Sequence, residues 1–283
     1  MENDNPLEKT LRDVELFLKQ QAELFGDETF LPDKTAAAQA VVTATSEERS
    51  DDIRPEHHED NGAELKQKPK TIKVSEEQGL FDGVVTSAEW KIDSQWHESE
   101  SLEILDSRIS GCMRCQLGST RKNFVFGVGN TKAKLVVIGE APGADEDEQG
   151  EPFVGRAGQL LNKILAAVQL RREDVYICNI LKCRPPNNRD PFPPEVESCE
   201  PYLKKQIEII NPKLILCLGR IAGQTLLKTN ATLAELRQSV YEYQGVKVLV
   251  TFHPAALLRN PNWKRPAWED VQKMRKMYDE LPD

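Results

Sequence analysis

No stretch of apolar residues in this 283-residue sequence approaches the about 18 needed to cross a membrane. The first residues, MENDNPLEKT, lack the basic and apolar regions of a secretion signal. These two absences predict a cytoplasmic protein with no membrane association. In a reducing compartment the six cysteines are expected to be thiols or metal ligands and not disulfides. The glycine-rich signatures of nucleotide-binding loops are also missing, which argues against a nucleotide cofactor.

Large apolar residues are scarce between positions 27 and 97, where Glu, Asp, Lys, Gln, Ser, Thr and Ala dominate. Residues 1–100 carry 24 acidic against 11 basic side chains, whereas the remainder carries 22 against 26. This composition predicts a largely disordered acidic extension over 1–97, with one amphipathic helix near 6–25 that is a candidate for binding another protein. A compact domain is expected over 98–283, and its mildly basic charge suits a polyanionic partner.

The second part of the chain alternates apolar runs with helical patterns, which predicts a three-layer α/β/α domain around a central four-stranded parallel sheet. Ligands in such sheets bind beyond the carboxyl ends of the strands. Glu140, Asn179 and His253 each stand at such an end and are therefore expected to meet at one edge. The expected strands are 135–139, 175–180, 214–219 and 246–252, and the expected helices are 156–169, 194–210 and 220–228.

The connection after the first strand, 140–152, is read as a long loop rich in glycine, proline and carboxylates. Closely spaced carboxylates repel one another and contribute nothing to a core. Phe153 and Val154 then follow with apolar side chains at the expected mouth of a ligand site. A segment that departs in this way from what folding alone favours marks a candidate functional site.

Four cysteines have spacings typical of a metal site. Cys112 and Cys115 form a C-x-x-C pair before the first strand, and Cys183 and Cys199 flank a proline-rich, irregular segment. Four thiolates fit either a structural zinc ion or an iron–sulfur cluster, and zinc is the default on spacing alone. The other two cysteines lie inside apolar strands and are expected to be buried small hydrophobic residues.

Over residues 100–283 the chain resembles the family-4 uracil-DNA glycosylases of bacteria and archaea. The likeness rests on four separate blocks that occur in the order of the family: GEAPGADEDEQGEPFVGRAGQLL (139–161), VYICNILKCRPPNNRDPFPPEVESC (175–199), LILCLGRIAGQTLL (214–227) and TFHPAALLRNP (251–261).

The resemblance implies a monofunctional enzyme of base excision repair, which flips uracil out of DNA and hydrolyses its N-glycosidic bond to leave an abasic site. It also implies a 4Fe–4S cluster held by the four cysteines, which reverses the zinc default. The implied partner is uracil-containing DNA, single- or double-stranded, and a monomer is expected. The resemblance does not extend to residues 1–97.

Individual residues take roles from the matching motifs. Phe153 matches the aromatic residue that stacks on the everted uracil, and Asn179 matches the asparagine that reads the base edge. His253 matches the histidine that faces uracil O2, where a hydrogen-bond donor stabilises the charge on the departing base. Gly139 and Ala141 complete the uracil site, and Ala141 stands where the best-known uracil glycosylases have a catalytic Asp.

The carboxylates and the DNA contacts follow from the same motifs. We expect Glu140 to orient or activate the attacking water and Glu146 to shape the pocket against the thymine methyl group. Backbone amides of 139–143 are expected on phosphates. Basic residues are expected to hold DNA, together with an apolar wedge into the base stack: Arg156, Lys182, Arg184, Arg189, Arg259 and Lys264, with Leu257 and Leu258 as the wedge.

Two other interpretations remain open. One is a glycosylase of the same fold that acts on other deaminated bases, such as hypoxanthine or xanthine. The other is a non-enzymatic iron–sulfur protein that binds DNA or serves as a scaffold. The joint presence of Glu140, Phe153, Asn179 and His253 argues against the second, because a scaffold requires none of them.

Overall fold

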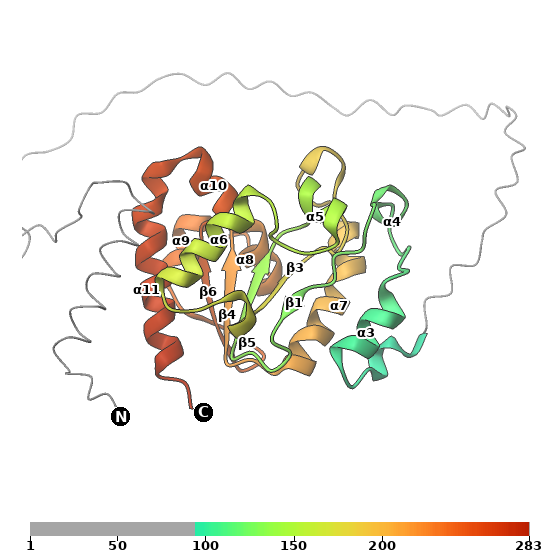
Figure 1. Ribbon diagram of the computed structural model, residues 1–283, viewed down its shortest axis with the longest axis horizontal. Helices are drawn as coiled ribbons and strands as arrows, with labels where there is room; N and C mark the ends of the chain where they lie inside the picture. The colour runs from blue at the N-terminus through green and yellow to red at the C-terminus, as the bar shows by residue number, and fades with distance from the viewer. Residues whose placement is uncertain (1–93, 283) are drawn as a thin grey trace, which may run out of the picture. The chain divides into compact units, whose positions relative to one another are not determined.

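The computed structural model describes residues 94–282, which build one twisted sheet covered by helices on both faces (Figure 1). The sheet has six strands in the order β1-β3-β2-β4-β6-β5. The four inner strands run parallel, and the two outer strands pair antiparallel to their neighbours. The strands are β1 (Val128–Gly129), β2 (Leu135–Gly139), β3 (Tyr176–Asn179), β4 (Leu214–Leu218), β5 (Tyr241–Tyr243) and β6 (Val246–Thr251).

The helices form the two outer layers and the connections. They are α3 (Leu102–Ile109), α4 (Leu117–Thr120), α5 (Ala144–Gln149), α6 (Arg156–Ala167), α7 (Pro193–Ile210), α8 (Arg220–Leu227), α9 (Leu233–Gln238), α10 (Pro254–Arg259) and α11 (Lys264–Asp279). Four short 3₁₀ turns add η1 (Ser94–Glu98), η2 (Arg172–Asp174), η3 (Pro186–Asn188) and η4 (Pro261–Trp263).

Alternate residues of each inner strand enter opposite cores, as the two-residue period of a strand requires. Val136 and Ile138 of β2 pack with residues of α3, α7, α8 and α9 on one face. Leu135 and Val137 pack with residues of α6 and α11 on the other face. Because both faces are covered, the inner strands consist mostly of buried apolar residues, and this explains why apolar runs identified them.

The predicted three-layer fold and its four parallel strands are confirmed, and so are the three predicted helices, here α6, α7 and α8. The sheet is wider than predicted, because β1 and β5 add an antiparallel strand at each edge. These two strands have only two and three residues, too few for a recognisable alternation.

The acidic segment 140–152 was predicted to be a continuous loop. This prediction is wrong, because the segment contains the helix α5. Gly143 precedes this helix, and the Glu146 carboxylate accepts a hydrogen bond from the Gly143 N–H at 3.0 Å. Its first turn carries Asp145, Glu146 and Asp147, where the positive end of the helix dipole favours carboxylates. The carboxylates that argued against regular structure therefore stabilise the start of a helix.

The helix expected at 6–25 and nearly all of the acidic extension lie outside the described residues. The first described element, η1, lies just before the expected domain boundary at 98. Trp96 in this turn is buried, and its ring meets that of Tyr202 edge-on, with 4.9 Å between the ring centroids. No helix within 94–282 is long and apolar enough to cross a membrane.

Candidate active site

A cleft opens at the carboxyl ends of the parallel strands, as the sequence predicted for Glu140, Asn179 and His253. Its volume is about 340 Å³, which is within the usual range for small-molecule sites. Glu140 follows β2, Asn179 ends β3, and His253 follows β6. The lining residues come from these strand ends, from the two connections after β2 and β3, and from the starts of α6 and α10 and the end of α10: Glu140, Ala141, Pro142, Gly143, Glu146, Phe153, Ala157, Asn179, Pro185, Asn188, Arg189, Asp190, His253, Ala255 and Arg259.

Asn179 presents an acceptor that the fold leaves unused. Its side chain is buried, and its Oδ1 atom has no hydrogen-bond partner among residues 94–282. An unsatisfied buried carbonyl costs about 1–3 kcal/mol, so it points to a ligand with a matching donor. The glycine beside it on β2 makes room for this arrangement, because a Cβ at Gly139 would lie 2.3 Å from Asn179 Oδ1 and 2.6 Å from Phe153 Cζ.

Phe153 is held in a strained backbone conformation beside the cleft. Its φ angle is +55°, in the left-handed region that bulky residues rarely adopt. Its ring is buried and lies 5.5 Å from the His253 ring, with 31° between the two planes. Such strain persists only where the surroundings enforce it, and it is typical of functional sites.

Two charged side chains enforce the position of Phe153 from either side. The Arg172 guanidinium donates to the carbonyl oxygens of Pro152 at 2.8 Å and of Phe153 at 3.1 Å. The Glu146 carboxylate accepts from the N–H groups of Val154 and Gly155, each at 3.1 Å. The backbone on both sides of the ring is therefore fixed by charge-assisted hydrogen bonds.

The imidazole of His253 is neutral and has a defined tautomer. Burial, with a smaller contribution from the nearby Arg259 cation, lowers the pKa of His253 to about 4. Its Nδ1 atom accepts a hydrogen bond from the Ala255 N–H at 3.2 Å, at the start of α10. Because Nδ1 is an acceptor, the hydrogen-bond network assigns the ring proton to Nε2, which can donate to a ligand.

Glu140 is a carboxyl group whose ionisation falls in the physiological range. Burial, with a smaller contribution from the Asp190 carboxylate, raises the pKa of Glu140 to about 7 against the opposing effect of the Arg220 cation. A carboxyl with this pKa is suited to accept a proton near neutral pH. Asp190 and Arg220 form an ion pair at 3.4 Å, so their opposing effects on the pKa of Glu140 come from neighbouring charges.

The four cysteines with metal-site spacing come from three parts of the fold. Cys112 and Cys115 lie between α3 and α4, Cys183 follows β3, and Cys199 lies in α7. Burial raises the pKa of Cys183 to about 11 and of Cys199 to about 12, and neighbouring thiols of this set contribute to both shifts. The four predicted cysteines belong to the same hydrophobic cluster, and Cys178 and Cys217 are buried in β3 and β4 as expected.

Hydrogen-bond donors surround the sulfur atoms of this group. Arg121 donates to Cys183 Sγ at 3.2 Å, and the Tyr202 hydroxyl donates to Cys112 Sγ at 3.2 Å. The backbone N–H of Lys182 donates to Cys199 Sγ at 3.3 Å. Donors of this kind stabilise thiolates and orient metal ligands. Within residues 94–282, no three His, Cys, Asp or Glu side chains converge closely enough to share a single metal ion.

Two residues expected on the DNA surface are buried instead. Leu257 is only 2% exposed and packs with Leu160, Phe252 and Ala267, so it does not form a wedge, whereas its neighbour Leu258 is 40% exposed. Lys182 is fully buried and donates from Nζ to the Asn179 carbonyl at 2.8 Å.

Of the remaining basic residues, Arg259 lines the cleft. Arg156 begins α6 with an exposed side chain, and Arg184 is half-buried. Arg189 lines the cleft too, but its guanidinium forms an ion pair with Glu195 at 2.6 Å.

Sequence reasoning missed Arg172 and the pair formed by Asp190 and Arg220. The contact of Arg172 with Phe153 spans 19 residues, and nothing in the local pattern announces it. Asp190 carried a usable signal, because it lies in the irregular, proline-rich segment that follows the predicted strand of Asn179.

Comparison with known proteins identifies the family. The sequence model of the Uracil DNA glycosylase superfamily matches residues 126–272. A type-4 uracil-DNA glycosylase of Archaeoglobus fulgidus is 49% identical over 183 residues, which cover 62% of this chain and 92% of that protein. The type-4 enzyme of Thermotoga maritima is 44% identical over 180 residues, covering 62% and 94%. A type-5 uracil-DNA glycosylase of Pyrobaculum aerophilum is 34% identical over 146 residues, covering 46% and 64%.

The chain belongs to the uracil-DNA glycosylase superfamily. The resemblance seen in the sequence is confirmed, and the lengths aligned with the two type-4 relatives, 183 and 180 residues, agree with its extent.

Proposed function

We infer that this protein is a DNA-repair glycosylase that hydrolyses the N-glycosidic bond of deoxyuridine in DNA, releasing uracil. Membership of the superfamily and the type-4 relatives support this function. The observation that carries it is the unsatisfied Asn179 Oδ1, buried in the cleft with the rings of Phe153 and His253. A flipped base is needed to reach such a site, because the bond is inaccessible inside a stacked duplex.

The proposed base recognition uses Asn179 and Phe153. Uracil N3–H donates to the free Asn179 Oδ1, and the side-chain amide donates to uracil O4. Cytosine presents an acceptor at N3 and a donor at N4, so it would leave these groups unpaired, and such losses reject a near-isostere by large factors. Phe153 stacks on the base, an interaction that contributes about 1–3 kcal/mol in nucleic-acid complexes.

The departing base is stabilised by His253. As the glycosidic bond breaks, its electron pair moves onto the pyrimidine, and negative charge builds at O2. The Nε2–H of the neutral imidazole donates to this oxygen, with its direction fixed by the Ala255 N–H bond to Nδ1. A donor aligned in advance acts like an oxyanion-hole group, since it needs no reorganisation during the reaction.

Glu140 is proposed to act on the sugar side of the bond. Its ionised form accepts a proton from the attacking water and faces the positive charge that develops on the sugar. Glu146 is assigned a different role, because both oxygens of its carboxylate are occupied by backbone N–H donors. It is a positioning residue that fixes Phe153 at the wall of the cleft. Its expected part in excluding the thymine methyl group is therefore indirect, through the position of this wall.

The four cysteines Cys112, Cys115, Cys183 and Cys199 are proposed to hold a 4Fe–4S cluster. Buried thiols with N–H and O–H donors around them fit such a group. The thiolates of the four cysteines would be the ligands of this cluster. When bound, the cluster supplies a covalent link between the segment before β1 and the segment that carries the cleft wall.

DNA is proposed to lie across the mouth of the cleft, held by Arg156, Arg184 and Arg259, with Leu258 in place of the buried Leu257 as the side chain that enters the base stack. The expected phosphate contacts make binding sensitive to salt. Affinity for a uracil-containing oligonucleotide should therefore fall steeply between low and high ionic strength.

Single-turnover release of uracil tests the assignment. The purified protein, analysed for iron, is incubated with an oligonucleotide that contains one deoxyuridine, and with matched oligonucleotides that contain cytosine, thymine or hypoxanthine. We expect release from deoxyuridine alone, with a loss of 100-fold or more, on the order of 3 kcal/mol, in Asn179→Ala. Asn123→Ala, which removes an amide that bonds only to α5 backbone carbonyls, is the matched control. Iron-replete protein that releases no uracil, or an Asn179→Ala variant as active as the parent, would overturn the proposal.

A further inference from the structure

The most exposed large apolar side chain in the described part of the protein belongs to Phe192, which is 55% exposed. It immediately precedes α7 and stands between Pro191 and Pro193, which restrict the backbone on both sides. Single exposed apolar residues are common on protein surfaces. Phe192 differs from such residues because specific polar contacts hold it in place.

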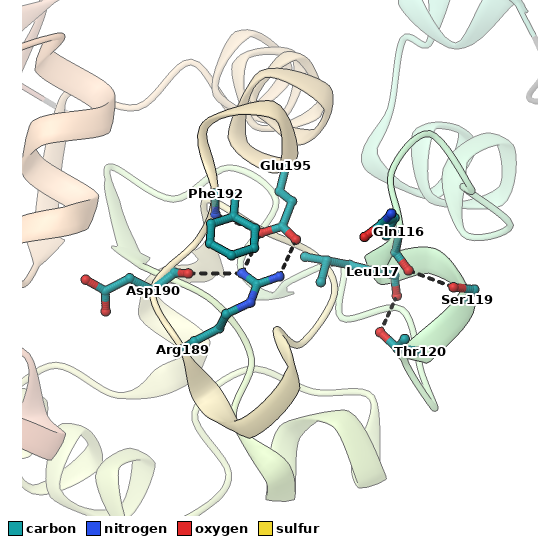
Figure 2. Close-up of polar contacts among 8 residues, drawn as sticks. All are labelled: Gln116, Leu117, Ser119, Thr120, Arg189, Asp190, Phe192 and Glu195. Carbon is teal, nitrogen blue, oxygen red and sulfur yellow. Dashed lines mark hydrogen bonds and ion pairs between the residues drawn. The ribbon is translucent and has the colours of Figure 1, made fainter. Parts of the chain in front are cut away.

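Arg189 and Glu195 form this clamp (Figure 2). The Arg189 guanidinium lies 3.7 Å from the centroid of the Phe192 ring. It also donates to both carboxylate oxygens of Glu195, at 2.6 and 2.9 Å. Glu195 is buried, and its Oε2 atom accepts the Phe192 N–H at 2.8 Å. One carboxylate therefore fixes both the cation under the ring and the backbone of the ring residue.

The clamp leaves one face of the ring available. Because the guanidinium covers one side, the exposed area of Phe192 lies on its opposite face and edge. An aromatic ring held rigidly loses little conformational entropy when a second planar group stacks on it. The cation on the covered face adds favourable electrostatics for a π system and lies close to where a polyanion would pass.

The clamped ring stands at the rim of the uracil cleft. Arg189 and Asp190, which stand three and two residues before Phe192, line the cleft itself, together with Asn188. A DNA strand that places one nucleotide in the cleft must pass its neighbours over this rim. The bases of those neighbouring nucleotides no longer stack on the everted uracil. The exposed face of the Phe192 ring can replace this lost stacking.

We propose that the Phe192 ring, backed by Arg189, is a stacking platform for a DNA base next to the everted uracil. The proposal rests on the proposed function, since it requires that DNA enter the cleft. Stacking of this kind tolerates any base sequence, because every base has a π face. It favours substrates whose neighbouring bases are free to leave the helix, and therefore single-stranded DNA over a fully paired duplex.

The test measures binding and not turnover. Each oligonucleotide carries one 2′-fluoro-deoxyuridine, whose glycosidic bond resists hydrolysis. One oligonucleotide has all its bases. In a series of six others, a single base is missing, at one of the three nucleotides on either side of the uracil. Affinity is measured by fluorescence anisotropy for the parent, Phe192→Ala, Phe192→Leu and Phe192→Trp. Val240→Ala, which shortens another exposed apolar side chain, is the matched control.

We expect Phe192→Ala and Phe192→Leu to bind the fully based single strand about five- to tenfold more weakly, near the lower end of measured base–aromatic stacking. Phe192→Trp and Val240→Ala should bind like the parent. On the one oligonucleotide that lacks the stacked base, the parent should bind as weakly as Phe192→Ala. Phe192→Leu keeps the bulk of the side chain, so it separates stacking from any effect of Ala on folding.

Two results would overturn the platform. One is equal affinity of all variants, and the other is a loss for Phe192→Ala and Phe192→Leu that is the same on every oligonucleotide of the series. Failure of the proposed function is recognised separately, because it would show as no uracil release by the parent from ordinary deoxyuridine DNA.

Discussion

Replacement of Glu140 by glutamine should stabilise the protein at alkaline pH while it impairs catalysis. Burial raises the pKa of this carboxyl from an ordinary value of 4.5 to about 7. The folded state therefore prefers the protonated form more strongly than the unfolded chain does. Below pH 4.5 the group is protonated in both states and costs nothing. As the pH rises from 4.5 through 7, stability is lost, because the unfolded chain gives up this proton while burial keeps it on the folded state.

The size of this effect follows from the shift in pKa. A difference between 4.5 and about 7 corresponds to about 3 kcal/mol when the group is ionised in both states. Glu140 is half-buried and lines an open cleft, so screening by water reduces the expected value to about 1–2 kcal/mol. Glutamine has a similar shape and does not titrate. Glu140→Gln should therefore gain this amount at pH 8.5 and nothing from this source at pH 4.5.

The assay is urea unfolding of the iron-replete parent and variant under anaerobic conditions, at both pH values. Glu151→Gln, which alters an exposed carboxylate nearby, is the matched control and should change the free energy of unfolding little. In single turnover, uracil release by the parent should rise with pH through about 7, and Glu140→Gln should lose about 100-fold or more of the rate. An equal stability difference between parent and Glu140→Gln at the two pH values would refute the reasoning about burial, and a near-normal rate would refute the catalytic role.

Three further predictions follow from individual contacts. Arg172→Met should weaken uracil-DNA binding about tenfold, on the order of 1.4 kcal/mol, because it frees the strained backbone at Phe153. Its exposed neighbour gives the control Arg171→Met, and equal dissociation constants would contradict the role of Arg172 in fixing Phe153. Gly139→Ala should abolish uracil release, since its methyl group would displace the base-reading amide, whereas Gly111→Ala has nothing within 4 Å and should be silent. Cys199→Ser should lower the iron content measured after purification, and a full complement of iron would remove this residue from the ligand set.

The sheet and its site edge were predictable because their signals are local. Each inner strand is made mostly of apolar residues, and parallel strands place their carboxyl ends together whatever connects them. This alone brought Glu140, Asn179 and His253 into one cleft. The ring of Phe153 was expected at the cleft from its position after the acidic segment, and it lies there.

The unpredicted features depend on contacts between distant residues. A lysine such as Lys182 is normally exposed, and only the Asn179 carbonyl and the Gln206 side chain, both acceptors for its Nζ, make its burial tolerable. Leu257 was assigned to the surface because its motif is a loop, but it follows the apolar face of α10 into the core. The acidic run became α5 because one of its own carboxylates caps it, an effect that composition does not reveal.

The two short outer strands also affect how copies of this protein behave beside one another. An uncapped margin of a parallel sheet is a row of unused peptide groups on which a second sheet can grow. Here the edge strand β1 has only two residues. The edge strand β5 has three, with the charged Glu242 in its middle. Neither edge strand of the described sheet is long enough to pair stably with a strand of another molecule. Concentrated solutions should therefore not form fibrils.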